Sequence, residues 1–333
     1  MTAILFMENR LPTFCAVRGV RLFLILLLLA AGCGHSTHFI EEESGDIAPS
    51  AGEEGGGESS PSASASTSVS FVTFGDWGSG RTAQQEVAEA IGDYCIANPC
   101  DFVLTLGDNF YSAGVSSTGD PLWIGRFHDV YDFLGLVFYA ALGNHDNEGS
   151  IEAQIAYTDL VDNWVMLDEH YTFSKPDVAT PPLVDFFIIN SDWPNFDRPA
   201  QDWLDASIET GTARWKILAM HHPIYSNGSH GDGEESYRED LVPIICNRID
   251  LVLSAHDHSF SHLRSDQDGC LIEQLVIGTG GARLRAVAAG DARVLATDSF
   301  YGFGWVQVTE ERILFRMLDL AGAVFYETTF EQD

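Results

Sequence analysis

Five short apolar runs in this chain each end at a polar residue that can bind a metal ion. These end residues are Asp76, Asp108, Asn144, His221 and His256. Each run has the length and composition of a buried strand. Because ligands bind beyond the carboxyl ends of the strands in an open α/β sheet, the five side chains are expected to converge in space. The chain therefore has to fold so that five strand ends meet at one site.

Each of these residues has a simpler explanation when it is taken alone. An Asp after a strand can cap a turn or a helix, and a lone His is more often structural than a metal ligand. The segment 256–258, His-Asp-His, is harder to explain in this way, because alternate residues beyond a strand can direct two imidazoles to the same side. Five such endings in one chain favour a shared metal site.

Strand-like and helix-like segments alternate through the first half of the chain. Strands are predicted at 69–74, 102–106 and 137–142, with helices at 82–97 and 123–134 between them. This βαβαβ order predicts a largely parallel sheet. Further strands are predicted at 184–189, 215–220, 249–253, 271–277, 304–309 and 313–318, and the last three are expected to form an antiparallel region. The predicted fold class is α/β, with two packed mixed β-sheets flanked by helices.

The N-terminus has the features of an export signal. Three arginines precede an apolar stretch at 22–31, which is too short to span a bilayer and has the length of a signal h-region. Residues 29–33, Leu-Ala-Ala-Gly-Cys, resemble the lipobox of bacterial lipoproteins, in which the Cys becomes a lipidated N-terminus. Ordinary cleavage after small residues, with Cys33 incidental, is the alternative. We expect an exported protein with a lipoprotein-type signal peptide at 1–33. A lipid anchor at Cys33 would attach it to a membrane, in the bacterial periplasm or at the outer membrane or cell surface.

A tether and one large domain are expected after the signal segment. Residues 34–69 are rich in Gly, Ser and Glu, and a segment of this composition cannot bury enough apolar surface to offset the entropy of ordering. A flexible linker is therefore predicted at 34–69 and a folded domain at 70–333. The net charge of −32, from 49 acidic and 17 basic residues, argues against a nucleic-acid-binding protein, because such proteins carry clusters of Lys and Arg.

Four cysteines remain after Cys33, an even number in a compartment where disulfides persist. They are Cys95, Cys100, Cys246 and Cys270, and three pairings are possible. We favour the two pairs that are closest in sequence, Cys95 with Cys100 and Cys246 with Cys270. Buried free thiols are the alternative.

The polar strand ends resemble the five ordered motifs of purple acid phosphatases, within the calcineurin-like metallophosphoesterases. The motifs are GDWG at 75–78, GDNFY at 107–111, GNHD at 143–146, LAMH at 218–221 and AHDH at 255–258. The resemblance is closest to the small, mammalian-type enzymes. Tyr111 is the discriminating residue, since most other metallophosphoesterases lack a tyrosine ligand. The resemblance implies an αββα metallophosphoesterase sandwich, with 70–333 as the catalytic domain.

The resemblance also implies a dinuclear centre with a ferric ion and a divalent ion, which could be iron, zinc or manganese. It assigns Asp76, Asp108, Tyr111 and His258 to the ferric ion, and Asp108, Asn144, His221 and His256 to the divalent ion, with Asp108 as the bridge. A phenol becomes a ligand at acidic pH only beside a strongly Lewis-acidic hard cation, which agrees with iron(III) at Tyr111.

Two positions depart from the family pattern. Ala255 stands where the family usually has Gly, and we expect the change to be harmless because only a small side chain is needed there. His222 stands where the family often has an aromatic residue, which affects the expected shape of the pocket rim more than the metals.

The implied activity is that of an acid phosphatase, which hydrolyses small phosphate monoesters by attack of a metal-bound hydroxide. His145 and His230 are candidates for phosphate contact and for donating a proton to the leaving group, and Asp146 is expected to orient His145 or a ligand. A surface-loop role is the alternative for His230. A phosphodiesterase or nucleotide pyrophosphatase with the same site is one alternative function, and a non-catalytic metal-binding surface protein is another.

Overall fold

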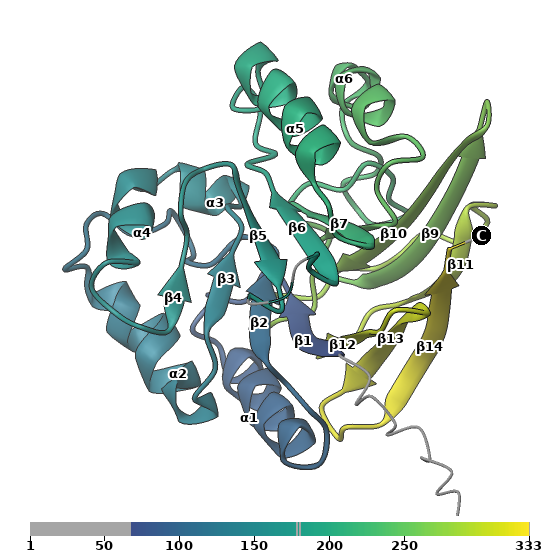
Figure 1. Cartoon of the computed structure of the whole chain (residues 1–333). Coiled ribbons are helices and arrows are strands. Elements are labelled where there is room, and N and C mark those ends of the chain that lie inside the picture. The colour runs from purple at the N-terminus through teal and green to yellow at the C-terminus, as the bar shows by residue number, and fades with distance from the viewer. Residues whose placement is uncertain (1–67, 178, 180, 333) are drawn as a thin grey trace, which may run out of the picture. The chain divides into compact units, whose positions relative to one another are not determined.

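Two seven-stranded sheets form the body of the protein (Figure 1). The computed structural model describes residues 68–177, 179 and 181–332. The predicted signal peptide at 1–33 and the linker up to residue 67 lie outside these residues. The first strand begins at Val69, one residue before the predicted domain boundary, and Val69 is buried there.

The first sheet joins the beginning of the described chain to its end. Its strands, in spatial order, are β14 (Val324–Glu331), β13 (Arg312–Asp319), β12 (Gly302–Val308), β1 (Val69–Phe74), β2 (Phe102–Thr105), β3 (Phe138–Ala140) and β4 (Trp164–Val165). The strands β1 to β4 are parallel, as predicted for the first half of the chain. The strands β12, β13 and β14 continue the sheet in antiparallel order from β1.

The second sheet is built from the middle of the chain. Its strands, in spatial order, are β11 (Val294–Asp298), β9 (Phe260–Gln267), β10 (Cys270–Ile277), β8 (Leu251–Ser254), β7 (Trp215–Ala219), β6 (Val184–Ile188) and β5 (Tyr171–Lys175). The neighbours β6, β7, β8 and β10 are parallel, and the strands at both edges are antiparallel. The predicted architecture of two mixed sheets flanked by helices is confirmed.

One predicted grouping of strands is wrong. The strand at 271–277 does not join the last two strands, because it is β10 and lies in the second sheet between β8 and β9. Its antiparallel partner is β9, which was not predicted. The turn between β9 and β10 is Asp268-Gly269, and both residues have positive φ, at 54° and 79°. Such a two-residue turn favours a tight hairpin, so β10 pairs with the strand directly before it.

Helices cover the outer faces of both sheets (Figure 1). The α-helices of the described residues are α1 (Thr82–Ala97), α2 (Asp129–Tyr131), α3 (Asn144–Asn147), α4 (Ile151–Tyr157), α5 (Arg198–Thr210) and α6 (Glu235–Ile245). The predicted helix at 82–97 is confirmed as α1. The predicted helix at 123–134 consists of three pieces, a π-helix at Trp123–His128, then α2, then a 3₁₀ helix at Asp132–Leu134.

Aromatic side chains fill the layer between the two sheets. The rings of Phe71 and Phe102, from the first sheet, have centroids 5.1 Å apart. The ring of Phe186, from the second sheet, meets both edge-on, at 5.3 Å and 5.7 Å. Such pairs contribute about 0.5–1.5 kcal/mol beyond the area that they bury. This packing fixes the position of one sheet against the other, and with it the positions of the strand ends.

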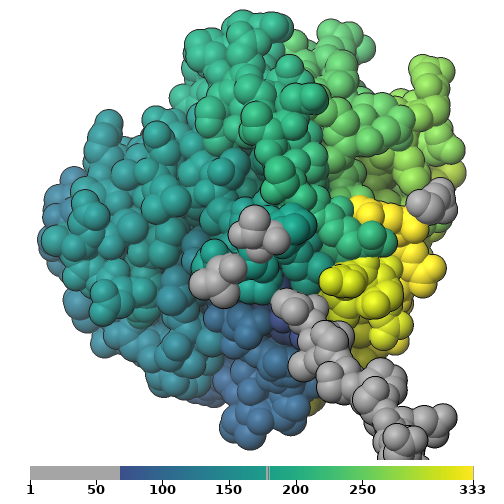
Figure 2. Space-filling view, viewed as in Figure 1, coloured from purple at the N-terminus to yellow at the C-terminus, as the bar shows by residue number. Residues whose placement is uncertain are grey.

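The two sheets are also joined at the side where the chain ends. In the space-filling view the C-terminal strands, in yellow, lie beside green residues of the second sheet (Figure 2). Here His262 of β9 is hydrogen-bonded through Nδ1 to the hydroxyl of Tyr326 of β14, at 2.9 Å. His262 is 1% exposed and Tyr326 is half-buried, so this polar contact is partly shielded from water.

Two disulfides join neighbouring elements. One links Cys95 with Cys100 and the other links Cys246 with Cys270, so the favoured pairing is confirmed. The first closes the connection from α1 to β2, and the second ties the end of α6 to the start of β10. Among the helices of the described residues, none has the length and apolar character needed to cross a membrane.

Candidate metal centre

The ends of five strands meet where the two sheets pack together. Asp76, Asp108 and Asn144 follow β1, β2 and β3 of the first sheet, whereas His221 and His256 follow β7 and β8 of the second. Asp76, Asp108 and His221 are each at most 1% exposed. The structure therefore brings carboxylates from one sheet against imidazoles from the other.

Three of these residues have a left-handed backbone conformation. The φ angle is 56° at Asp76, 52° at Asp108 and 68° at His256. Asp, Asn and His occupy this region more often than other residues that have a side chain. The left-handed residue turns the chain sharply where each strand ends. The amide of Asp76 donates to the carbonyl of Gly107 at 3.0 Å, which ties the first two of these turns together.

Ala255 replaces a glycine of the family pattern without strain. The positive φ lies at the next residue, His256, and Ala255 itself is not among the described residues with positive φ. The methyl group of Ala255 packs beside Gly75, where an added Cβ would lie only 2.4 Å from it. As expected, residue 255 can carry a small side chain, because its neighbour Gly75 has no side chain.

Asp76, Tyr111 and His258 form a first donor group. The Tyr111 hydroxyl donates to Asp76 Oδ1 at 2.9 Å and lies 3.3 Å from His258 Nε2. The distance between Asp76 Oδ1 and His258 Nε2 is 3.2 Å. Asp108 belongs to this group as well, because ligand atoms of Asp76, Asp108 and His258 all lie within 4.8 Å of one another. Two carboxylates, a phenol and one imidazole suit a hard cation.

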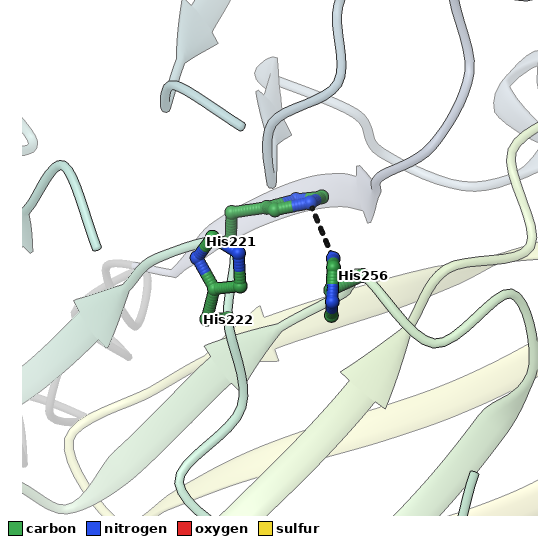
Figure 3. Close-up of side chains that lie close together, drawn as sticks. All are labelled: His221, His222 and His256. Carbon is green, nitrogen blue, oxygen red and sulfur yellow. Dashed lines mark hydrogen bonds between the residues drawn. The ribbon is translucent and has the colours of Figure 1, made fainter. Parts of the chain in front are cut away.

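Asn144, His221 and His256 form a second, adjacent donor group. Asn144 Oδ1 lies 3.1 Å from His221 Nε2 and 3.0 Å from His256 Nδ1. The two ring nitrogens are 3.2 Å apart, and Figure 3 shows the imidazoles of His221 and His256 turned toward each other. Asp108 Oδ1 is 3.5 Å from His221 Nε2, so Asp108 reaches both groups. This is the division of donors that the resemblance implied.

Backbone carbonyls fix the orientation of two of the imidazoles. His221 Nδ1 donates to the Leu106 carbonyl at 2.8 Å, and His258 Nδ1 donates to the Arg283 carbonyl at 2.8 Å. In the neutral rings this leaves the Nε2 lone pairs directed into the centre. The lone pair of His221 then faces Asn144 Oδ1, which can only accept. Two acceptors at this distance repel unless a cation lies between them, so the donor set fits a metal ion.

The electrostatics of the centre also favour added positive charge. Burial alone would lower the pKa values of His221 and His258, but Asp108 beside His221 and Asp76 beside His258 raise both above the ordinary value. Burial alone would raise the pKa of Asp76, but His258, together with His221 and His256, outweighs burial and lowers it. Burial and the two carboxylates raise the pKa of Tyr111, so a phenolate at this position requires a cation beside it.

His222 lies closer to the second donor group than the sequence indicated. A ring nitrogen of His222 lies within 4.8 Å of nitrogens of His221 and His256, so the three imidazoles could hold one ion (Figure 3). Burial and the neighbouring His221 lower the pKa of His222 to about 3, which keeps its ring neutral. Its Nδ1 lies 3.2 Å from the Ser191 hydroxyl. The only signal for this role in the sequence is its place directly after His221.

His145 lies at the open edge of the centre. Its Nδ1 donates to the Ser112 carbonyl at 2.6 Å, which leaves Nε2 unpaired in the neutral ring, at 4.0 Å from Asp108 Oδ2. Its side chain is 32% exposed. His145 is therefore near the proposed bridging ligand and open to a substrate.

Asp146 does not contact the His145 ring. Its carboxylate accepts from the backbone amides of Asn109, Phe110 and Gly143, at 2.9–3.1 Å. Burial and the nearby Asp108 raise its pKa to about 7 against the effect of these hydrogen bonds. Asp146 therefore does not orient the His145 ring. Its carboxylate holds together the loops after β2 and β3, which carry the proposed ligands Asp108 and Asn144.

The ring of His230 packs against the second donor group. Its ring centroid lies 4.1 Å from that of His256. Arg285 Nη1 donates to His230 Nε2 at 2.9 Å, and because a guanidinium can only donate, the neutral ring carries its proton on Nδ1. That proton is donated to Asp257 Oδ1 at 3.1 Å. The contact of His230 with Arg285 was not predicted, since the two residues are 55 positions apart.

Sequence comparison relates the chain to known phosphatases. The model of the calcineurin-like phosphoesterase family matches residues 69–260. Purple acid phosphatase 3 of Arabidopsis thaliana is 32% identical over 286 residues, which cover 78% of this chain and 76% of that protein. Human tartrate-resistant acid phosphatase type 5 is 26% identical over 300 residues, which cover 79% of this chain and 91% of that protein.

Solved structures share the fold at lower identity. A purple acid phosphatase, PPD1 from yellow lupin seeds, has a TM-score of 0.62 and 17% identity over 80% of this chain and 54% of that one. GAP50, the anchor in the inner membrane complex of Plasmodium, has a TM-score of 0.68 and 22% identity, over 80% and 89%. The family model, the sequence relatives and the paired donor groups agree. The chain belongs to the calcineurin-like phosphoesterases, within the purple acid phosphatase family, which implies a dinuclear metal centre and phosphoesterase chemistry.

Proposed function

We propose that the protein is an acid phosphatase that hydrolyses small phosphate monoesters at a two-metal centre. The observation that carries the proposal is the position of Asp108 between two unlike donor groups, one with Tyr111 and one with His221. The oxygen-rich group with Tyr111 suits iron(III), and the group rich in imidazole suits divalent iron, zinc or manganese. When bound, such a pair supplies Lewis acidity and a hydrolytic water at acidic pH.

The residues around the centre have different tasks in this proposal. Asp76, Asp108 and the Tyr111 phenolate neutralise only part of the charge of the two ions, so a net positive charge faces the substrate. A phosphate monoester can lose a second proton, with a pKa of about 6 in water that nearby positive charge lowers, whereas a diester carries only one negative charge. The centre therefore attracts a bound monoester more strongly than a bound diester. This difference supports monoesters as the preferred substrates.

His145 is the better candidate for protonating the leaving group. Its Nε2 has no other partner than the centre itself, so a proton carried there can pass to a leaving oxygen. His230 Nε2 accepts from Arg285 instead, and it would have to lose this contact before it could donate a proton. We therefore assign the proton donor to His145. Both ring nitrogens of His230 already have partners, so His230 is assigned the task of positioning Arg285.

Metal analysis combined with paired substrates tests this function. Purified protein should contain about two metal ions per chain, one of them iron, and its kcat/KM at acidic pH should be at least about tenfold higher for phenyl phosphate than for diphenyl phosphate. A preference for the diester would make the protein a phosphodiesterase. Hydrolysis of neither ester by the protein with both metals bound would favour a non-catalytic metal-binding role.

We further propose that the protein is exported and anchored through lipid on Cys33. The support is the composition of residues 1–33 alone. The protein should be recovered with membranes and carry a lipid mass on residue 33, and Cys33→Ser should abolish both. A soluble, unmodified wild-type protein would refute the anchor.

A further inference from the structure

A basic pocket opens beside the metal centre. Its volume is about 400 Å³, and it is lined by Ser229, His258, Arg283, Leu284 and Arg285. His258 is a proposed metal ligand, so the pocket and the centre share a wall. Both arginines are exposed. In a chain with a net charge of −32, a pair of arginines beside a centre that acts on anions is a local reversal of the surface charge.

Backbone hydrogen bonds hold the arginine segment against the centre. His258 Nδ1 donates to the Arg283 carbonyl at 2.8 Å, and the Arg285 amide donates to the His258 carbonyl at 3.0 Å. The preceding Gly278 allows this approach, because a Cβ there would lie 2.5 Å from Asp76 Oδ2. The two guanidinium groups are therefore carried by a segment whose distance from the metal ligands is fixed.

The side chain of Arg285 is anchored without losing its charge. Its Nη1 donates to His230 Nε2 at 2.9 Å and reaches the Ser229 hydroxyl at 3.5 Å. His230 is held in turn by Asp257, which accepts from both its amide and its Nδ1. Neither Arg283 nor Arg285 forms a salt bridge with a carboxylate of the part of the chain that the structure describes. Their remaining donors are free to bind an anion.

We propose that Arg283 and Arg285 form a subsite for a second phosphate group of the substrate. The inference rests on the proposed function, and it narrows the substrate class to phosphate monoesters whose leaving group carries another phosphate, such as bisphosphates. The phosphate to be hydrolysed binds at the metals, and the second phosphate binds in the basic pocket beside His258. Arginine suits this task because its planar donors match phosphate oxygens in pairs.

A matched pair of substrates isolates the subsite. Ethylene glycol bisphosphate and ethylene glycol monophosphate differ only in the second phosphate. We expect Arg283→Gln and Arg285→Gln each to lower kcat/KM for the bisphosphate about tenfold, mainly through KM, and to change it less than about twofold for the monophosphate. Arg312→Gln is the control for charge, because Arg312 is exposed at the opposite end of the sheet from Asp76.

A binding measurement separates this proposal from the proposed function. In calorimetry with the metal-loaded protein, Arg283→Gln should weaken the affinity for inorganic pyrophosphate about tenfold and leave that for inorganic phosphate unchanged. If the wild-type protein hydrolysed neither ester, the proposed function would be wrong. The pyrophosphate titration would still show whether the arginine subsite exists. Equal losses for both esters, or an unchanged pyrophosphate affinity, would overturn the subsite. Arg283→Gln is informative even if Arg285→Gln disturbs His230, because the two ring nitrogens of His230 are hydrogen-bonded to Arg285 and Asp257.

Discussion

At the scale of single residues, Tyr111 is a proposed ligand that needs a cation beside it in order to ionise. Its hydroxyl contacts Asp76 and His258, and its pKa is raised by burial and by the carboxylates. A bound iron(III) would reverse this effect and hold a phenolate, which gives a charge-transfer band in the visible. We expect the oxidised protein to be coloured, and Tyr111→Phe to lose the band while iron is retained. Full iron content without a band in the wild type, or a band that survives the substitution, would refute iron at Tyr111.

Substitutions of the adjacent residues Asn144 and His145 should have different effects on metal binding and on turnover. Asn144→Ala removes a proposed ligand, so the divalent ion should bind at least about tenfold more weakly and turnover should fall for every substrate. His145→Ala should keep both metals and slow alkyl phosphates about 100-fold, but activated aryl phosphates less than about threefold, because only a poor leaving group needs the proton. Metal content and kcat/KM for both ester types provide the measurement.

Two results would contradict the role of His145. Loss of metal from His145→Ala would make it a structural residue, since its amide already donates to Asp108 Oδ1 at 3.0 Å. Equal slowing of alkyl and aryl esters would make it a phosphate-binding residue. His128→Ala is a suitable control, because His128 is a partly buried histidine that bonds Asp132 and Tyr157 rather than residues of the centre.

The sequence was sufficient to predict the positions of residues that directly follow a strand. Asp76, Asp108 and Asn144 were predicted together because each follows an apolar run, and the structure places them together. Arg285 could not be predicted, since its contact with His230 depends on how a loop after β10 meets a loop after β7. The same holds for His222, whose closeness to His256 is a property of the folded sheet edge.

At the scale of elements, β9 shows why a strand can be missed when it is predicted from its hydrophobic pattern. This strand buries Ser261 and Ser265 on one face and His262 on the other, each at most 3% exposed, so neither face has a purely apolar pattern. The turn at 268–269, Asp-Gly, was the usable signal for the hairpin with β10. Buried polar groups on β9 find partners on other strands, which a single segment of sequence does not display.

One of these partners gives a prediction for the pH dependence of stability. Glu273 of β10 accepts hydrogen bonds from His262 and Arg264 of β9. Burial alone would raise the pKa of Glu273, but these two residues lower it below its ordinary value of 4.5. Because the folded pKa is depressed, the stabilisation is present above pH 4.5 and is lost as the pH falls through the folded value.

Glu273→Gln should therefore lower the free energy of unfolding by roughly 2 kcal/mol at pH 7. The difference from wild type should shrink below pH 4.5, where the Glu273 carboxyl of the unfolded chain takes up a proton before that of the folded protein does. Urea unfolding at several pH values measures this difference, with Glu311→Gln, an exposed residue of the same type, as the control. A difference that stayed constant down to pH 3 would show that the loss comes from packing and not from the charge.

At the scale of the whole molecule, neither sheet holds a complete site. The first sheet supplies Asp76, Asp108 and Asn144, and the second supplies His221, His256 and His258. Bound metals would therefore connect the two sheets. Removal of the metals by a chelator should lower Tm by several degrees, measured by calorimetry with and without added metal. An unchanged Tm would mean that the aromatic layer alone fixes the sheets.

All proposed site residues lie within the residues that the structure describes. A chain that begins at Ser68 should keep kcat within about twofold of the full-length protein, because the preceding segment has the composition of a linker. A chain that begins at Gly75 is the matched control, since it lacks β1 and should not fold. A large loss of turnover in the longer of the two would show that residues before 68 contribute to catalysis.

The pairing of β1 with β12 has a consequence for how the protein is made. Val69 is synthesised long before Val308, its antiparallel partner. At roughly 5–20 residues per second, a ribosome needs about 10 to 50 seconds to reach the second from the first. During that time one edge of β1 stays unpaired and open to wrong partners, including other nascent chains. The first sheet can therefore close on this side of β1 only after residue 308 has been synthesised.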